Sequence, residues 1–425
     1  MSHLISRFRP DFGPYEALYK KLHANPELSC YEGSTASVVA QQLQLLAGVE
    51  IKTGIGGHGV VGVMRNGEGP VVMLRAELDA LPVLEQTGLP YASTKRTPTG
   101  EPLMHACGHD MHMTALLASA QLLHMARSYW RGTVVFAFQP DEENGAGAKR
   151  MVDDGLYDTQ RHAVPPPDIV LGGHVMPMRS GTISTRKGPF NSASESFRVT
   201  LYGQGGHGGK PHQTIDPIVM ACSTVMKLQT IVSREIDPQE AAVVTVGSIA
   251  AGRVANVIPE VATLLVNTRS FTDITRKHLR ASITRIVEAE SMSSGSPKAP
   301  VIEKISSFPL LFNDYAATEK VEQAMMGHFG GEAFSTDIPI STGSEDIANL
   351  ANPVSAAVCF WNYGGTDPKL FDDAVKQGGA GQIPANHSAK FAPVIQPTMT
   401  VATDAYALAA LTFLETRPEC VSRSI

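Results

Sequence analysis

The sequence predicts an α/β protein built on a central, mostly parallel sheet, with a smaller α+β domain inserted into it. Short apolar runs alternate with helical patterns at both ends of the chain, which is typical of a layered α/β unit. The pattern changes near Gly188 and resumes after Ser306. We therefore expect a discontinuous larger domain at residues 1–188 and 307–425, and an inserted domain at 189–306.

The first part of the chain alternates helices and strands. Apolar spacing predicts helices at Tyr15–His23, Ser34–Leu46, His112–Ala126 and Gly145–Asp154, and strands at Val60–Arg65, Val71–Ala76, Thr133–Gln139 and Ile169–His174. A long polar loop is expected at Glu85–Glu101. Functional residues gather at the carboxyl ends of the strands in such sheets, and this is where the polar clusters of the sequence fall.

The remaining elements divide between the two domains. The insertion should contain strands Ser196–Tyr202, Ala242–Ile249 and Val261–Arg269, with helices Pro217–Arg234 and Thr275–Ser291. The larger domain should then continue with helix Tyr315–His328, strand Val354–Trp361 and helix Pro397–Leu414. We see no internal repeat of 20–50 residues, so a solenoid is not expected.

Composition narrows the class of protein. The chain has 425 residues, 43% hydrophobic and 18% charged, with a formal net charge of -6, which suits a packed interior and excludes wholesale disorder. The sequence has no run of basic residues, so neither nucleic acid nor an anionic membrane is expected as a partner. No stretch reaches the roughly 18–20 apolar residues of a membrane span, and the N-terminus lacks a secretory pattern. Five scattered cysteines fit a reducing compartment, so we expect a cytoplasmic protein.

The densest cluster of reactive side chains is M-H-A-C-G-H-D-M-H, which runs from Met104 to His112. Cys107 and His109 stand two residues apart around Gly108, and a thiolate with imidazole suits zinc and similar borderline metals. Because glycine allows the backbone to turn, both side chains could reach one ion from a tight loop. A polar helix start, or a redox thiol beside a base, is the alternative interpretation.

A second cluster, Q-P-D-E-E-N-G, follows the strand Thr133–Gln139 directly. Adjacent acids would repel one another at the end of a buried strand unless solvent or a cation intervened. Neighbouring residues leaving a strand point in different directions, so one of Glu142 and Glu143 could bind metal while the other faces a water molecule. A solvated acidic turn that starts a helix is the alternative.

Three further residues are weak signals when each is considered alone. His174 closes the strand Ile169–His174, His387 lies in a loop rich in Gly and Pro, and Asp79 follows a strand where it could orient a ligand from behind. A single histidine is usually structural. All of these positions nevertheless follow predicted strands or lie in loops of the same α/β unit, which favours one shared site.

The motifs in order resemble one enzyme family. R-A-E-L-D-A-L-P, M-H-A-C-G-H-D, F-Q-P-D-E-E, G-G-H-V-M-P, G-G-H-G-G-K-P-H-Q-T-I-D-P, N-V-I-P, G-S-E-D and N-H-S all occur. Together they resemble the amidohydrolase branch of the aminoacylase/carboxypeptidase metallopeptidases, which includes hippurate hydrolases and plant auxin-conjugate hydrolases. The resemblance extends over roughly Tyr15 to Leu414.

This resemblance implies a role for each matching residue. Cys107, His109, Glu143, His174 and His387 match metal ligands, and Glu142 matches the general base. One or two divalent ions are implied, with Zn²⁺ or Mn²⁺ expected and Ni²⁺ or Co²⁺ as alternatives. The inserted domain is implied to be a dimerisation domain, so we expect a homodimer or a higher homo-oligomer.

The resemblance also implies contacts with substrate. His207 matches a histidine that approaches the substrate carbonyl, often from a partner subunit, and Asn256 and Arg269 match positions that can hold the substrate carboxylate. The chain departs from the family at Glu77, where many relatives carry Asp, and at Asp141, where many carry Ala. We expect Asp141 to add negative charge near the base.

The function implied is metal-dependent hydrolysis of the amide bond of an N-acyl amino acid. A metallo-dipeptidase or carboxypeptidase is the nearest alternative, and a thiol nucleophile at Cys107 is a different chemistry for the same residues. An inactive relative that only binds a metal or ligand is the alternative from another class of protein.

Overall fold

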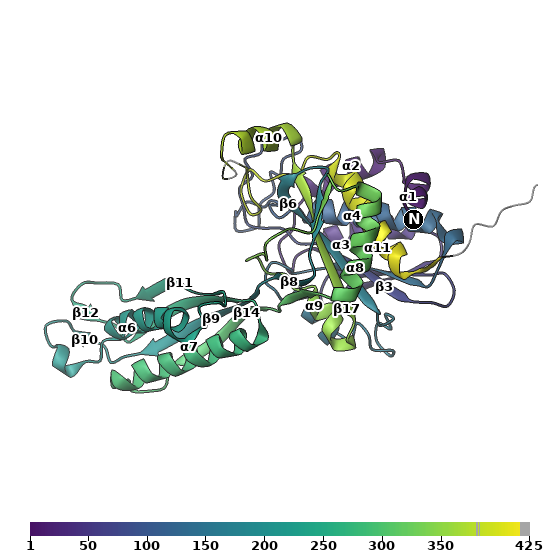
Figure 1. Cartoon of the computed structure of the whole chain (residues 1–425). Helices are drawn as coiled ribbons and strands as arrows, with labels where there is room; N and C mark the ends of the chain where they lie inside the picture. Colours follow the sequence, from purple (N-terminus) through teal and green to yellow (C-terminus); the bar gives the residue numbers. More distant parts are fainter. Residues whose placement is uncertain (380, 382, 417–425) are drawn as a thin grey trace, which may run out of the picture. The chain divides into compact units, whose positions relative to one another are not determined.

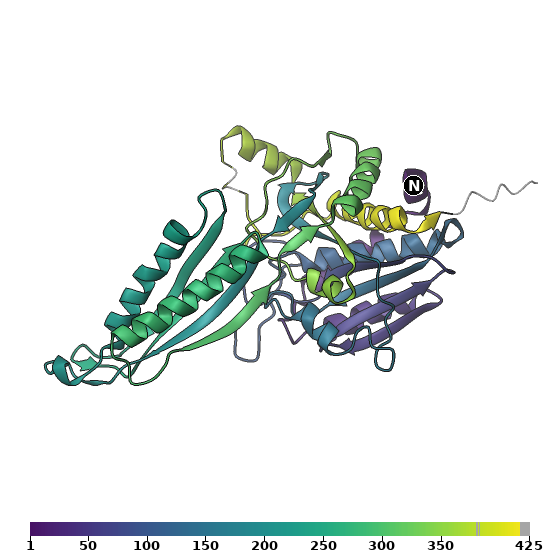
Figure 2. The same ribbon diagram turned by 60° about the horizontal axis from the view of Figure 1, so that its bottom comes forward.

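The computed structural model describes residues 1–379, 381 and 383–416, and the chain divides into two compact units. The larger unit contains Met1–Phe190, Phe312–Pro339 and the described residues from Asp346 onward. The smaller unit contains Asn191–Leu311 and the loop Ile340–Glu345. The end of the predicted larger domain, residues 417–425, lies outside the described residues. Figures 1 and 2 show the elements of both units from two directions.

An eight-stranded sheet forms the centre of the larger unit, in the order β1-β2-β5-β3-β6-β17-β7-β16. The middle strands β5, β3, β6 and β17 run parallel, while β2 and β7 on either side of them run in the opposite direction. The mostly parallel sheet predicted from the sequence is therefore confirmed. Its strands are β1 (Val49–Ile55), β2 (Gly59–Arg65), β3 (Val71–Glu77), β5 (Thr133–Gln139), β6 (Ile169–Arg179), β7 (Ile183–Thr185), β16 (Phe334–Ser335) and β17 (Ala357–Thr366).

Helices cover both faces of this sheet. Successive strand residues point to opposite faces. A Cβ at Gly173 would meet the ring of Trp361, which contacts Tyr406, whereas a Cβ at Gly172 would meet Ile347. Helix α11, which carries Tyr406, and α9, which begins after Ile347, thus lie on opposite faces. The helices of this unit are α1 (Ser2–Phe8), α2 (Gly13–His23), α3 (Gly33–Gln44), α4 (His109–Met125), α5 (Gly147–Asp153), α8 (Tyr315–Phe329), α9 (Ala348–Ala351), α10 (Pro368–Lys376) and α11 (Thr398–Phe413).

Helix α4 begins at His109, before its predicted start at His112. Gly108 stands directly before it with a φ of 82°, a left-handed conformation that other residues rarely adopt. This glycine lets the chain turn from the loop straight into the helix. Every residue from His109 to Ala120 is buried, since α4 packs against the sheet, α2 and α11. Such all-round burial removes the polar face that usually reveals a helix.

In the described ranges, no helix is long and apolar enough to cross a membrane.

The smaller unit is a four-stranded antiparallel sheet covered by two helices. The strand order is β11-β13-β9-β14, and α6 and α7 share one apolar core with Phe197, Val199 and Leu201 of β9. The predicted helices and strands of this region are confirmed, while β14 was not predicted. The bounds are β9 (Ala193–Tyr202), β11 (Ala242–Ala251), β13 (Val261–Ser270), β14 (Val301–Phe308), α6 (Pro217–Thr230) and α7 (Asp273–Ser293).

A buried histidine holds α2 against the start of α4. His23 Nδ1 lies 2.6 Å from Asp110 Oδ2, and its Nε2 lies 3.0 Å from Glu85 Oε1. Burial opposes the charged form of His23, but the hydrogen bonds and charges of Asp110 and Glu85 raise its pKa to about 10. A protonated His23 therefore ties the helix that opens at His109 to the loop that follows β3.

This arrangement predicts a pH-dependent contribution of His23 to stability. The pKa of His23 is higher in the folded chain than its ordinary value of about 6.5. The charged His23 therefore contributes its full stabilisation below pH 6.5, and this contribution is lost as the pH rises through about 10. We expect His23→Gln to cost about 3–5 kcal/mol of unfolding free energy at pH 7, because it leaves two buried carboxylates without their cation. The cost should shrink steadily between pH 7 and pH 10.

Urea unfolding of the two proteins at several pH values measures this cost. Lys21→Gln, an exposed change in the same helix, is the control and should have little effect at any pH. A cost of His23→Gln that stays constant up to pH 10 would contradict the assigned charge.

Candidate metal centre

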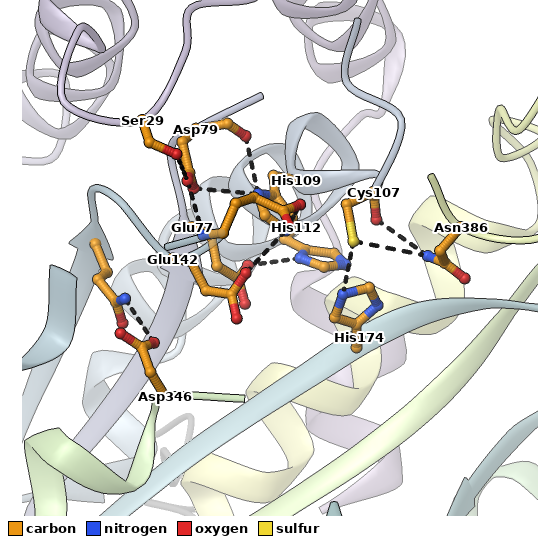
Figure 3. A network of polar contacts seen from close by, with 12 residues as sticks. Ser29, Glu77, Asp79, Cys107, His109, His112, Glu142, His174, Asp346 and Asn386 are labelled. Atoms are coloured by element: carbon orange, nitrogen blue, oxygen red, sulfur yellow. Dashed lines mark hydrogen bonds and ion pairs between the residues drawn. The ribbon is translucent and has the colours of Figure 1, made fainter. Parts of the chain in front are cut away.

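Segments far apart in the sequence bring their reactive side chains together in the larger unit. Cys107 lies in the loop before α4, and His109 is the first residue of that helix. Glu142 and Glu143 follow β5, His174 lies within β6, and His387 lies in the loop between α10 and α11. Figure 3 shows part of this cluster, with the Cys107 sulfur facing His174 and Asn386. All six side chains that the sequence nominated for metal binding and base catalysis are thus in one place.

The Cys107 thiol occupies the middle of the cluster. Its Sγ lies 3.4 Å from His174 Nε2 and 3.3 Å from His387 Nε2. Two groups of three potential ligands share this sulfur: one adds His109 and His174, and the other adds Glu143 and His387. Within each group the ligand atoms lie within 4.8 Å of one another. The Cys107 sulfur could therefore act as a ligand in either group.

His109 presents a ring nitrogen to the acids of the turn after β5. Its Nδ1 lies 2.9 Å from the Asp79 carbonyl oxygen, which can only accept, so Nδ1 carries a proton. Its Nε2 is buried and has no hydrogen-bond partner among the described residues. That nitrogen lies 3.8 Å from Glu143 Oε1 and 4.0 Å from Glu142 Oε2. Burial opposes the charged form of His109, but Asp79 and Glu77 raise its pKa to about 10, so these acids favour positive charge at Nε2.

The turn that carries the two glutamates is rigid. Asp141 has a φ of 55°, and its carbonyl accepts the N–H of Gly147 at 3.0 Å. A Cβ on Gly147 would lie 1.6 Å from the Pro140 oxygen, so only glycine fits there. The Asp79 carboxylate accepts the Glu143 N–H at 3.0 Å, which anchors the turn from the other side. The supporting role that we predicted for Asp79 stays a prediction.

The Asp141 carboxylate, which we expected to add negative charge near Glu142, has two partners of its own. It lies 2.8 Å from the Arg150 guanidinium and accepts a hydrogen bond of 2.6 Å from Asn144. Arg150 therefore balances much of the negative charge that Asp141 adds near Glu142.

The donor set fits a divalent cation. Burial raises the pKa of the Cys107 thiol, and burial also raises the pKa of Glu143 to about 7. Without a cation, Cys107 and Glu143 would therefore keep their protons, because their lone pairs would otherwise face those of their neighbours. One Glu143 oxygen and His109 Nε2 are buried without hydrogen-bond partners among the described residues. A cation between sulfur, imidazole nitrogen and carboxylate oxygen would satisfy all of them, and this mixture of donors suits Zn²⁺ and related transition metals.

Sequence reasoning gave no role to several buried residues that support the cluster. Glu77 pairs with Arg75 and with His112, and Arg75 also reaches Asp346 at 2.9 Å. Asp346 stands in the G-S-E-D motif, whose function the sequence left unassigned. A charged residue in the middle of an otherwise apolar strand, as Arg75 is in β3, was the signal available, because such a residue needs buried partners.

The three nominated substrate-binding residues lie in the smaller unit. His207 pairs with Val257 across a short ribbon of β10 (Gly206–His207) and β12 (Val257–Ile258), and the Gly208 N–H donates to the Asn256 carbonyl. The structure thus brings His207 and Asn256 near each other, and both are exposed. Arg269 belongs to β13, where it donates to the Ser344 hydroxyl at 2.6 Å and to the Thr342 carbonyl.

Known proteins resemble this chain over most of its length. The model of peptidase family M20/M25/M40 matches residues 73–377. Hippurate hydrolase of Campylobacter jejuni is 37% identical over 350 residues, which cover 82% of this chain and 88% of that protein. IAA-amino acid hydrolase ILR1-like 2 of Arabidopsis thaliana is 34% identical over 338 residues, covering 79% and 73%. The solved structure of the Bacillus subtilis YXEP protein, described as a dinuclear metal-binding peptidase of the M20 family, has a TM-score of 0.73 at 27% identity and covers 98% of this chain and 100% of that one.

Proposed function

Because this chain belongs to peptidase family M20/M25/M40, we propose that it hydrolyses the amide bond of N-acyl amino acids with Glu142 as general base. The observation that carries this proposal is the convergence of lone pairs around Cys107, with His109 Nε2 buried and unpartnered among the described residues. Such a set of groups is unfavourable by itself and becomes favourable around a divalent cation.

The proposed ligands are Cys107, His109, Glu143, His174 and His387. Cys107 belongs to two groups of three potential ligands, one with His109 and His174 and one with Glu143 and His387, so these residues could hold one or two ions. Zn²⁺ or Mn²⁺ is the expected metal, with Ni²⁺ or Co²⁺ as alternatives. When bound, a divalent ion supplies Lewis acidity that polarises an amide carbonyl and lowers the pKa of water.

Glu142 performs the proton transfers in this proposal. Glu142 is 7% exposed, and its Oε2 lies 4.0 Å from His109 Nε2, so it stands beside the proposed ligands. Glu142 would accept a proton from the attacking water molecule and return it to the nitrogen of the leaving amino acid. Because Glu142 is little exposed, few bulk water molecules reach its carboxylate, and its electrostatic interactions are stronger than they would be in water.

The substrate class rests on the relatives and on the smaller unit. Relatives named for hydrolysis of hippurate and of IAA-amino acids support an acyl amino acid as substrate. We propose that His207 contacts the substrate carbonyl and that Asn256 and Arg269 contact its carboxylate. Burial lowers the pKa of Arg269, whose ordinary value is high enough that the guanidinium remains a cation suited to a carboxylate.

We also propose that two copies of the chain associate through the smaller unit. Strand β11 lies at the edge of its sheet, and an edge strand can pair with a second copy. Next to it, Val219 and Met226 of α6 and Ile249 of β11 are 65%, 71% and 51% exposed. A groove of about 350 Å³ between these two elements adds to this apolar surface. The predicted cytoplasmic location stays a prediction.

The base assignment predicts a separation of metal binding from turnover. We expect Glu142→Gln to bind the same amount of metal as the wild type and to lose at least about 10²–10⁴ in kcat, since the proton acceptor is gone. Hydrolysis is followed on N-acetyl, N-benzoyl and indole-acetyl amino acids, with dipeptides tested for the alternative peptidase activity. Glu101→Gln, an exposed change, is the control. Full kcat in metal-loaded Glu142→Gln would remove Glu142 from the mechanism.

The metal-dependent mechanism predicts reversible loss of activity on chelation. Dialysis against a chelator should abolish hydrolysis, and added Zn²⁺ or Mn²⁺ should restore it. Bound metal should protect Cys107 from iodoacetamide, while the exposed Cys30, which lies outside the proposed contact between copies, reacts in both forms and serves as an internal control. Activity that survives chelation but is lost on alkylation of Cys107 would instead support a thiol nucleophile.

The proposed association predicts a change in mass on disrupting the α6 surface. We expect Met226→Glu to convert a dimer into a monomer in light scattering, because a charge would enter the apolar contact. Met292→Glu, at an 81% exposed position on α7, should leave the dimer unchanged. A wild-type monomer, or a Met226→Glu dimer, would exclude this interface.

A further inference from the structure

A third group of potential ligands lies next to the proposed metal site. Glu77, His109 and His112 are all buried, and one ligand atom from each lies within 4.8 Å of the others. Carboxylate and imidazole side chains of this kind could hold an additional cation. The hydrogen bonds of Glu77 and His112 give them a different function.

Both oxygens of Glu77 already have a hydrogen-bond partner. Its Oε2 lies 2.6 Å from His112 Nδ1, and its Oε1 accepts from the Arg75 guanidinium. Arg75 is fixed in turn by Gln139 at 2.9 Å and by Asp346 at 2.9 Å. Both carboxylate oxygens therefore accept from cationic or N–H donors in a buried network. Figure 3 shows the contact between Glu77 and His112.

His112 also has no free lone pair. Its Nε2 lies 2.9 Å from the Val175 amide nitrogen, and an amide N–H can only donate, so Nε2 must be unprotonated. The ring proton is then on Nδ1, where it is donated to Glu77. His112 is therefore held in one tautomer by two partners.

The Val175 peptide connects His112 to the proposed ligands. Strand β3 pairs with β6 only as far as Gly172, and beyond that point the Val175 N–H goes to His112 instead of to a strand. The Val175 carbonyl accepts from His174 Nδ1 at 2.8 Å and from Asn386 Nδ2 at 3.1 Å. Because His174 Nδ1 must carry the donated proton, its Nε2 presents a lone pair toward the Cys107 sulfur, 3.4 Å away.

We propose that His112 and Asn386 are positioning residues that hold the backbone of Val175, one at its N–H and the other at its carbonyl, and thereby aim His174 Nε2 into the metal centre. This inference rests on the metal site of the proposed function. In it, Glu77 and Arg75 act one step further away, by fixing the tautomer of His112. Partners of this kind orient a ligand and keep its binding nitrogen free of a proton.

Two substitutions of His112 separate this role from simple packing. In His112→Asn the side-chain amide can take the place of Nδ1 and donate to Glu77, but nothing accepts the Val175 N–H. In His112→Gln the longer side chain can place its oxygen where Nε2 was and accept that N–H, while the contact with Glu77 is lost. The proposal predicts that the contact with Val175 decides metal affinity.

The experiment measures the affinity of the full chain for Co²⁺ and Zn²⁺ by competition with a chromophoric chelator. We expect His112→Asn to weaken binding by about 10–100-fold and His112→Gln to retain most of the wild-type affinity. The charge-transfer absorption of thiolate-bound Co²⁺ should weaken in parallel in His112→Asn. Equal losses in both variants, or none in either, would overturn the proposal, because a merely structural role does not distinguish them.

A second variant keeps the test decisive if His112→Asn does not fold. Asn386→Leu removes the donor to the Val175 carbonyl from a half-buried loop residue, and the proposal predicts weaker metal binding there too. Unchanged affinity in Asn386→Leu would overturn the role of Asn386. A wild-type chain that binds neither metal would overturn both this inference and the proposed function, whereas tight binding by the wild type and equally by His112→Asn would overturn the inference alone.

Discussion

The arrangement of the larger unit depends on one electrostatic constraint: a thiol, three imidazoles and two carboxylates meet in a site that is mostly buried. His109 Nε2 lies within 4.0 Å of both Glu142 and Glu143, and the Cys107 sulfur contacts two further ring nitrogens. Lone pairs and negative charges gathered in this way cost free energy unless a cation lies among them. Metal binding would therefore contribute to the stability of the fold as well as to the chemistry.

The sheet gathers these groups because its middle strands run parallel. β3, β5 and β6 deliver Glu77, the Glu142–Glu143 turn and His174 toward one end, and Gly108 turns the chain so that α4 begins at that same place. The supporting contacts are largely backbone: the Asp79 carbonyl, the Val175 peptide and the Glu143 N–H each hold one functional side chain or turn. The geometry of the site is thus fixed by the strand ends themselves.

The sequence predicted the parallel sheet, the family and the residues that converge, because apolar periodicity and the short motifs carry that information locally. It did not predict that α4 starts at His109, because Gly108, directly before it, favours a loop. It also gave no role to His112 or Asp346, whose partners Val175 and Arg75 lie 63 and 271 residues away. Contacts of that kind follow from the pairing of strands, which a single sequence does not display.

X-ray absorption spectroscopy of the metal-loaded protein reports the atoms around the ion, so it tests whether the Cys107 sulfur is a metal ligand. With Zn²⁺ bound, we expect a sulfur neighbour at about 2.3 Å together with nitrogen or oxygen neighbours at about 2.0–2.2 Å. The sulfur signal should vanish in Cys107→Ser. A metal surrounded only by nitrogen and oxygen in the wild type would contradict the proposed centre.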